Sequence, residues 1–159
     1  MERIEKFIEV ACPLRAAYDQ WTQFESFPEF MTGVREVRQL DPVRVQWLAD
    51  INGREEQWTA EITEQTPDER ISWRSISGAN NAGTVRFEAL AEKRTLVRLY
   101  LAYEPAGVLE SVGDAVGLTE MQVTRSLENF KTFMEGRDAA TGAWRGVVHD
   151  SRADEGTRS

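Results

Sequence analysis

The chain contains few of the side chains on which nucleophilic or metal-assisted chemistry depends. It has one histidine, His149, and one cysteine, Cys12. A Ser-His-Asp or Cys-His arrangement needs a histidine beside its nucleophile. His149 stands in a segment rich in glycine and charge near the C-terminus, where we expect a surface residue. A zinc site also draws on several histidine and cysteine ligands. The sequence therefore predicts neither a catalytic triad nor a metal site.

Carboxylates are the next candidates for chemistry. Glu55 and Glu56 are adjacent, but neighbouring residues of a strand point to opposite faces, so this pair does not converge. Glu56 and Trp58 are two residues apart on an expected strand, so both can point toward the interior of the protein. The alternative is that Glu56 is a solvated residue at the rim of the sheet. If the protein is an enzyme, acid–base work falls to residues such as Glu56 and Tyr103.

Three glycines, at positions 107, 113 and 117, fall inside or beside an expected helix. They lack the strand-loop-helix context of a phosphate-binding loop. The spacing of Gly113 and Gly117 leaves two interpretations, close packing of a helix on a sheet or a flexible lid. Close packing is the preferred interpretation, and the lid rests on the fact that glycine lowers helix stability by roughly 1 kcal/mol relative to alanine. Glu110 and Asp114 in the same stretch argue against a membrane helix.

The charge balance narrows the possible partners. The formal net charge is −8 and the pI is about 4.8, which opposes the phosphate contacts of nucleic-acid binding. The stretch MERIEKFIEV carries charges inside its only apolar run, so it predicts neither a signal peptide nor an anchor. We expect a cytoplasmic protein, a monomer or weak homodimer, with no cofactor, no nucleic-acid partner and no integral membrane association.

Apolar periodicity predicts a strand over residues 2–11, followed by two helices. The first helix is expected to begin near Pro13, because proline suits the first turn and apolar residues follow at helical spacing. The stretch SFPEFM predicts a second, very short helix, with Ser26 and Glu29 at the spacing of a capping box. From Gly33 the apolar period changes to two, which predicts strands joined by short turns. Such strands form an antiparallel meander.

After Pro105 the period returns to 3.6, which predicts a helical region. Thr119 and Gln122 stand at capping-box spacing, so we expect a break or kink near Gly117. Beyond it an apolar stripe continues at helical spacing and must lie on the apolar face of the sheet. We therefore expect one domain over residues 1–138 and a polar C-terminal tail over residues 139–159, partly disordered.

This order of elements is that of a helix-grip fold. The stretches WTAEITEQTPDERISWRSISG, RTLVRLYLAYEPAGVLESVGDAVG and TGAWRG resemble the bacterial polyketide cyclase/dehydrase-like branch of the START-related (SRPBCC, Bet v 1-like) superfamily. The resemblance covers nearly the whole chain. It implies an α+β fold in which a curved seven-stranded antiparallel sheet wraps around a long C-terminal helix. Two short helices lie between the first and second strands of such a fold.

In that superfamily the space between sheet and helix holds lipids, quinones, polyketides or hormones. The resemblance therefore implies that this chain binds a small hydrophobic molecule. Alternation places Trp73, Ser75 and Ser77 on one face, which suits a mostly apolar pocket with a few polar groups better than a packed core. The residues expected to line the cavity are Trp47, Trp58, Trp73, Ser75, Phe87, Leu99, Tyr103, Val123 and Leu127.

Other interpretations stay open. Trp47, Trp58 and Trp73 fit a packed core as well as a cavity wall. A second possible function is a polyketide cyclase or dehydratase that uses the same cavity, with Glu56 and Tyr103 as candidate catalytic residues. In aromatase/cyclase relatives the polyketide is held in a set shape, which favours one ring closure. A third is a protein-interaction module that acts through its surface, as quinone-chaperone and toxin relatives do.

Overall fold

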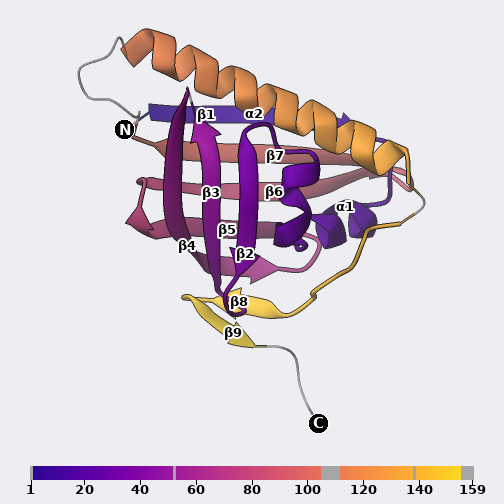
Figure 1. The fold of residues 1–159 in the computed structure, drawn as a ribbon. Helices are drawn as coiled ribbons and strands as arrows, with labels where there is room; N and C mark the ends of the chain where they lie inside the picture. The colour runs from indigo at the N-terminus through magenta and orange to yellow at the C-terminus, as the bar shows by residue number, and fades with distance from the viewer. Residues whose placement is uncertain (1, 52, 105–111, 138, 155–159) are drawn as a thin grey trace.

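Seven antiparallel strands form a curved sheet (Figure 1). The structure is a computed structural model that describes residues 2–51, 53–104, 112–137 and 139–154, with the backbone alone for 112–118. The strands are β1 (Glu2–Val10), β2 (Val34–Gln39), β3 (Arg44–Ile51), β4 (Arg54–Thr66), β5 (Arg70–Gly78), β6 (Asn81–Ala91) and β7 (Arg94–Tyr103). They lie side by side in the order β1-β7-β6-β5-β4-β3-β2. This arrangement confirms the predicted helix-grip class.

Three helices accompany the sheet. They are α1 (Leu14–Trp21), the short η1 (Phe24–Glu29) and the long α2 (Val112–Glu135). The long helix lies across the concave face of the sheet, and α1 sits beneath its C-terminal end (Figure 1). Leu127, Phe130 and Met134 of the predicted stripe are buried. Among the described residues, no helix combines the length and the hydropathy that crossing a membrane requires.

Two expected helix boundaries are wrong. η1 is a 3-10 helix that begins at Phe24 and has no side-chain cap, so Ser26 and Glu29 do not form a capping box. Its aromatic residues Phe24 and Phe27 are buried, and their packing places the helix. The second expectation, a break near Gly117, also fails, because α2 continues through this position. The low helix propensity of glycine therefore does not end the helix here.

Two turns between strands and the end of β7 meet at one end of the sheet. The chain turns from β3 to β4 between Ile51 and Arg54, and from β5 to β6 between Gly78 and Asn81. Asn81 pairs with Tyr103 at the end of β7. Gly78 has a φ of +81°, and a Cβ atom there would lie 2.1 Å from a backbone oxygen of β4, so the turn requires glycine. We call this region the open end.

The segment after α2 adds two short strands, β8 (Val147–His149) and β9 (Arg152–Asp154). β8 pairs with β4, and β9 pairs with β8. β3 pairs with β4 only as far as Glu61, so β8 continues along the edge of β4 that β3 leaves open. Val148 is fully buried. Much of the stretch expected as a polar tail therefore packs on the sheet, while residues 155–159 lie outside the described residues.

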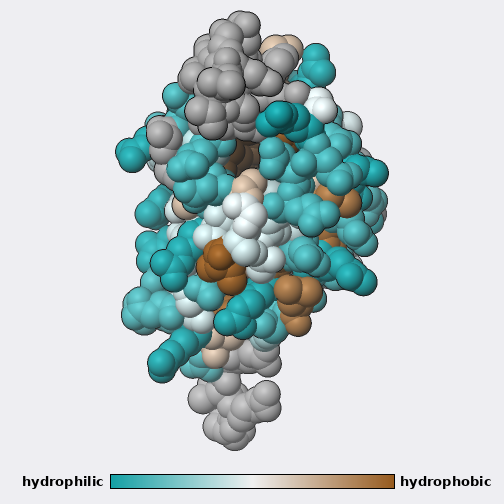
Figure 2. All heavy atoms as spheres, turned by 60° about the vertical axis from the view of Figure 1, so that its left-hand side comes forward, coloured by the Kyte–Doolittle hydropathy of each residue, from teal (hydrophilic) through white to brown (hydrophobic). Residues whose placement is uncertain are grey.

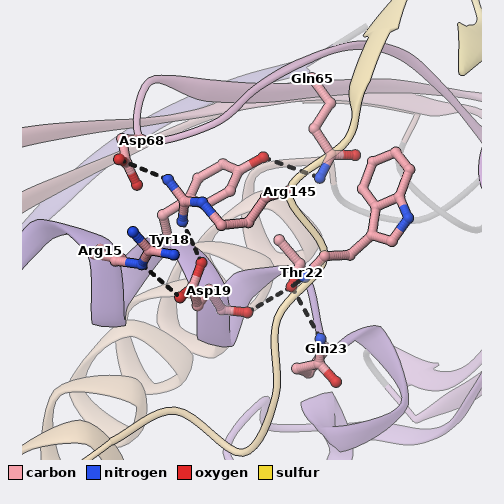
Figure 3. A network of polar contacts seen from close by, with 9 residues as sticks. Arg15, Tyr18, Asp19, Thr22, Gln23, Gln65, Asp68 and Arg145 are labelled. Atoms are coloured by element: carbon pink, nitrogen blue, oxygen red, sulfur yellow. Dashed lines mark hydrogen bonds and ion pairs between the residues drawn. The ribbon is translucent and has the colours of Figure 1, made fainter. Parts of the chain in front are cut away.

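Arg145 holds this segment against α1 (Figure 3). Its guanidinium pairs with Asp19 of α1 and, at 2.7 Å, with Asp68 in the β4–β5 turn. The backbone N–H of Trp144 donates a hydrogen bond to Oγ1 of Thr22 at 3.1 Å. These contacts add to the bonds that Asp19 and Thr22 already make within α1 and with Gln23. The stretch TGAWRG thus fastens α1 to the sheet.

Candidate ligand cavity

A cavity of about 440 Å³ lies between the sheet and α2. Trp21, Phe24 and Phe27, which come from α1 and η1, line its apolar closed end. At the open end, Asn80 and Glu104 line the cavity and are also exposed, so the cavity reaches the surface there. Figure 2, which brings the left-hand side of Figure 1 forward, shows a recess with hydrophobic atoms at its floor on a mostly hydrophilic face.

Three tryptophans from successive strands line the same cavity. Trp47 of β3 and Trp58 of β4 are direct cross-strand partners, and their rings stack with centroids 5.6 Å apart and an interplanar angle of 10°. Trp73 of β5 also lines the cavity, and its Nε1 donates a hydrogen bond to Oδ1 of Asn81 at 3.3 Å. All three are partly buried. The rings therefore pack on one side and face the cavity on the other.

A polar network orders the turn at the open end. Nδ2 of Asn80 donates to Oε1 of Glu104 at 3.1 Å, and Nδ2 of Asn81 donates to the carbonyl oxygen of Ala79 at 3.2 Å. The backbone N–H of Asn81 donates to Oγ of Ser75 at 3.0 Å. Both asparagine side chains are thus engaged within the turn and its neighbouring strand.

Tyr103 and Glu56 place polar groups on the cavity wall. Burial raises the pKa of Tyr103, although a hydrogen bond with Thr119 opposes that effect. The phenol therefore stays protonated at neutral pH and can donate a hydrogen bond. Glu56 makes no hydrogen bond or ion pair with any of the described residues. The wall offers a phenolic donor and a carboxylate acceptor, which are the components of acid–base chemistry.

α2 is anchored to the sheet through side chains that the sequence analysis missed. Nε2 of Gln122 donates to the carbonyl oxygens of Thr32 at 3.3 Å and Asp50 at 3.1 Å. Oγ of Ser126 accepts from the N–H of Thr32 at 2.9 Å. Gly33 has a φ of +86°, and a Cβ atom there would lie 2.6 Å from the carbonyl oxygen of Asp50, so this approach needs glycine. The expected helix-capping role of Gln122 is therefore wrong.

Most of the residues expected at the cavity do line it. They are Trp47, Trp58, Trp73, Leu99, Tyr103, Val123 and Leu127, together with Glu56. The first five come from the inward-facing positions of four strands, and the helix residues come from the face of α2 that covers them. Their contact with a ligand, and any catalytic role of Glu56 or Tyr103, stay predictions.

Phe87 and Ser75 do not line the cavity. Phe87 packs on Tyr18 and Trp21, with ring centroids 5.5 and 6.1 Å away, because α1 covers this part of β6. The Ser75 hydroxyl faces the β5–β6 turn, where it accepts the N–H of Asn81. A strand pattern gives the face of a residue but not the helix or turn that engages it, so these two expectations fail.

A β-bulge breaks the alternation on which the interpretation of β5 rested. Ser75 pairs with Ala60 and Ser77 pairs with Thr59, so three residues of β5 stand opposite two of β4. Ala60 lines the cavity, whereas Ser77 is exposed. Ser75 therefore lies on the same face of β5 as Trp73, whereas Ser77 does not. A bulge depends on the partner strand, so a single strand's pattern cannot reveal it.

Outside the cavity, one group of described side chains has spacing that suits a metal ion. Donor atoms of Glu64, His149 and Asp150 lie within 4.8 Å of one another at the surface. Nδ1 of His149 lies 3.0 Å from Oε2 of Glu64. This contact raises the pKa of His149 and lowers the pKa of Glu64. The group joins the β8–β9 turn to β4 through its own hydrogen bonds.

The fold and its cavity define a START-type helix-grip protein, and comparisons with known proteins agree. Residues 10–132 match the model of the family described as polyketide cyclase/dehydrase and lipid transport. A 17.2 kDa protein of Streptomyces lincolnensis, from the melC2–rnhH intergenic region, is 44% identical over 149 residues, which cover 93% of this chain and 99% of that protein. The chain belongs to the polyketide cyclase/dehydrase and lipid transport family.

Solved structures share the fold at low sequence identity. A START superfamily protein from Mycobacterium smegmatis has a TM-score of 0.71 at 16% identity, covering 83% of this chain and 98% of that one. The Zhui aromatase/cyclase from Streptomyces sp. R1128 has a TM-score of 0.73 at 18% identity, covering 89% and 98%. At these identities the likeness shows that the chain shares the fold of these proteins.

Proposed function

We propose that this protein binds a small hydrophobic molecule in the cavity between the sheet and α2. The observation that carries the proposal is a cavity of about 440 Å³ with tryptophans and aliphatic residues on its wall. Ligand sites commonly enclose about 300–1,000 Å³ and combine an apolar wall with a few placed polar groups. An empty apolar cavity forgoes dispersion contacts, which a ligand of matching shape would supply.

The first experiment is native mass spectrometry of the protein purified from its source organism. Solvent extraction then identifies any molecule that co-purifies with it. The extracted molecule, or an analogue, is then titrated into the emptied protein while tryptophan fluorescence is recorded. Because Trp47, Trp58 and Trp73 line the cavity, entry of a ligand should change their emission.

Ala60→Phe tests whether binding occurs in the cavity. Ala60 is buried on the wall, and a phenyl ring there would fill space that the ligand needs. We expect the variant to stay folded and to lose at least about tenfold in affinity, equivalent to ~1.4 kcal/mol. Thr59→Phe is the matched control, because this neighbouring residue does not line the cavity. Equal affinity of folded Ala60→Phe and wild type would contradict the proposal and direct attention to surface partners.

Cyclisation is the second candidate, favoured by the phenol of Tyr103 and the carboxylate of Glu56 on the same wall. A protonated phenol can stabilise a carbonyl oxygen as it gains charge, and a carboxylate can accept a proton from the adjacent carbon. Tyr103→Phe and Glu56→Gln separate the two functions. A cyclase should lose turnover in one of them while it retains binding, whereas a binding protein should show only modest losses of affinity.

A further inference from the structure

The cavity wall carries negative charge and no positive charge among the described residues. Glu56 and Glu104 line the cavity, while no lysine, arginine or histidine does so in the part of the chain that the structure describes. Residues 105–118, which follow Glu104 in the sequence, also contain no lysine, arginine or histidine. A ligand in this cavity therefore meets carboxylates without a compensating cation on the described wall.

Both carboxylates lie at the open end. Glu56 stands opposite Ala49, close to the β3–β4 turn. Glu104 directly follows Tyr103, the last residue of β7, and binds Asn80 in the β5–β6 turn. The apolar closed end under α1 and η1 has no such groups. A ligand that fills the cavity thus places its apolar body inside and its outer end beside these acids.

Two cations near the open end are engaged elsewhere, and a third, Arg54, is exposed and does not line the cavity. Arg35 pairs with Glu55 and Asp50, both of which are exposed. Lys6 of β1 pairs with Glu120 of α2 at 3.9 Å. Glu56, in contrast, has no hydrogen bond or ion pair with a described residue. Its charge is therefore not neutralised by any neighbour that the structure describes.

The amide donors around the opening are also engaged. Gln122 donates to the carbonyl oxygens of Thr32 and Asp50, Asn80 donates to Glu104, and Asn81 donates to the carbonyl oxygen of Ala79. What remains for a ligand at this end is the phenolic donor of Tyr103 and two negatively charged acceptors, Glu56 and the second oxygen of Glu104. Such a surface repels an anionic group and attracts a hydrogen-bond donor or a cation.

We infer that the ligand is a hydrophobic molecule whose outer end carries a hydroxyl or amine group and which has no carboxylate or phosphate there. This inference rests on the proposed function and adds the polarity of the ligand to it. Donors at the outer end would pair with the partly buried Glu56 and with the exposed Glu104, and hydrogen bonds to charged acceptors are stronger than those between neutral groups. A carboxylate in the same place would meet two like charges, which disfavour its ionised form.

The test uses three anthracenes that carry an aminomethyl, a hydroxymethyl or a carboxylate group at the same ring position. Their dissociation constants are measured at neutral pH and low salt, with wild type and with Glu56→Gln and Glu104→Gln. We expect the amine and the alcohol to bind at least about tenfold more tightly than the carboxylate. Each substitution should reduce the amine-to-carboxylate ratio by roughly threefold or more, because it removes one charge.

Glu55→Gln is the matched control, since Glu55 is adjacent to Glu56 in the sequence but is exposed and paired with Arg35. It should leave the ratio unchanged. Carboxylate binding as tight as that of the amine, or ratios that neither substitution alters, would overturn the inference while the proposed function stands. Failure of all three probes to bind, or binding that Ala60→Phe does not weaken, would overturn the proposed function and this inference with it.

Discussion

The indole of Trp73 occupies the space that a side chain at Gly83 would fill. The two residues are partners across β5 and β6. A Cβ atom at Gly83 would lie 2.5 Å from Cζ2 of Trp73 and 2.6 Å from the carbonyl oxygen of Tyr100. The missing side chain lets the indole lie against the neighbouring strand, where its Nε1 also reaches Asn81. One wall of the cavity therefore depends on a glycine that does not itself line it.

Gly83→Ala should destabilise the protein and change the cavity. The new methyl group must move Trp73 or the backbone of β7, because both distances are far below normal contact. Overpacking of this kind lowers the free energy of unfolding by about 1–3 kcal/mol. Urea denaturation measures the loss. Gly136→Ala is the control and should be nearly neutral, because its Cβ would lie 3.4 Å from its nearest neighbour. Equal stability of the two variants would contradict this account.

Periodicity was sufficient to predict the sheet, the long helix and the three tryptophans of the cavity wall. Trp47, Trp58 and Trp73 occupy inward positions because a strand alternates strictly between faces until a bulge intervenes. The bulge in β5 and the helix that covers Phe87 arise from other segments of the chain. The pattern of one strand does not reveal those neighbours, so Ser77 was assigned to the wrong face. Phe87 and Ser75 were assigned to the cavity, although α1 covers Phe87 and the β5–β6 turn engages Ser75.

The packing of residues 139–154 was beyond prediction for a similar reason. Glycine and charged residues dominate this stretch, and such composition usually indicates a tail. Its order comes from specific partners far away in the chain, among them Asp19 and Asp68 for Arg145. Trp144 and Val148, which pack against the core, were the local signals of burial, whereas Val147 is exposed.

Arg145→Met should release this segment from α1. The substitution keeps much of the aliphatic volume but removes the ion pairs to Asp19 and Asp68. Only 12% of the Asp19 side chain is exposed, so its carboxylate would lose a partner at a poorly hydrated site. We expect the free energy of unfolding to fall by about 1–3 kcal/mol in urea denaturation.

Arg74→Met is the matched control for Arg145→Met. Its guanidinium pairs with Glu61 at 3.4 Å, but 63% of the Arg74 side chain is exposed. Exposed ion pairs contribute about 0–1 kcal/mol. If the free energy of unfolding falls no more in Arg145→Met than in Arg74→Met, the contact of Arg145 with α1 contributes little to stability.

His149 should titrate above its ordinary pKa of 6.5, because its hydrogen bond with Glu64 stabilises the charged imidazole. The chain has a single histidine, so NMR resolves one imidazole titration without assignment. In Glu64→Gln the pKa of His149 should move back toward its ordinary value. An unchanged pKa in this variant would show that Glu64 does not contact the ring in solution.

The same pair predicts a pH window for its contribution to stability. The pKa of His149 is raised, so its contribution is complete below 6.5 and is lost as the pH rises through the raised value. The pKa of Glu64 is lowered, so its contribution is complete above 4.5 and is lost as the pH falls through the lowered value. The difference in Tm between wild type and His149→Gln should therefore be largest between pH 4.5 and pH 6.5 and decline at lower and at higher pH.

Trp58→Leu should weaken ligand binding more than it weakens the fold. The ring stacks on Trp47 and faces the cavity. Its loss therefore removes one aromatic contact to the ligand and one to Trp47. Aromatic pairs contribute about 0.5–1.5 kcal/mol beyond their buried area, which corresponds to a roughly two- to tenfold rise in Kd. Trp144→Leu is the control, because this ring is also partly buried but does not line the cavity. Calorimetric titration of both variants with the co-purified ligand measures the effect, and a larger rise in Kd for Trp144→Leu would place the ligand outside the cavity.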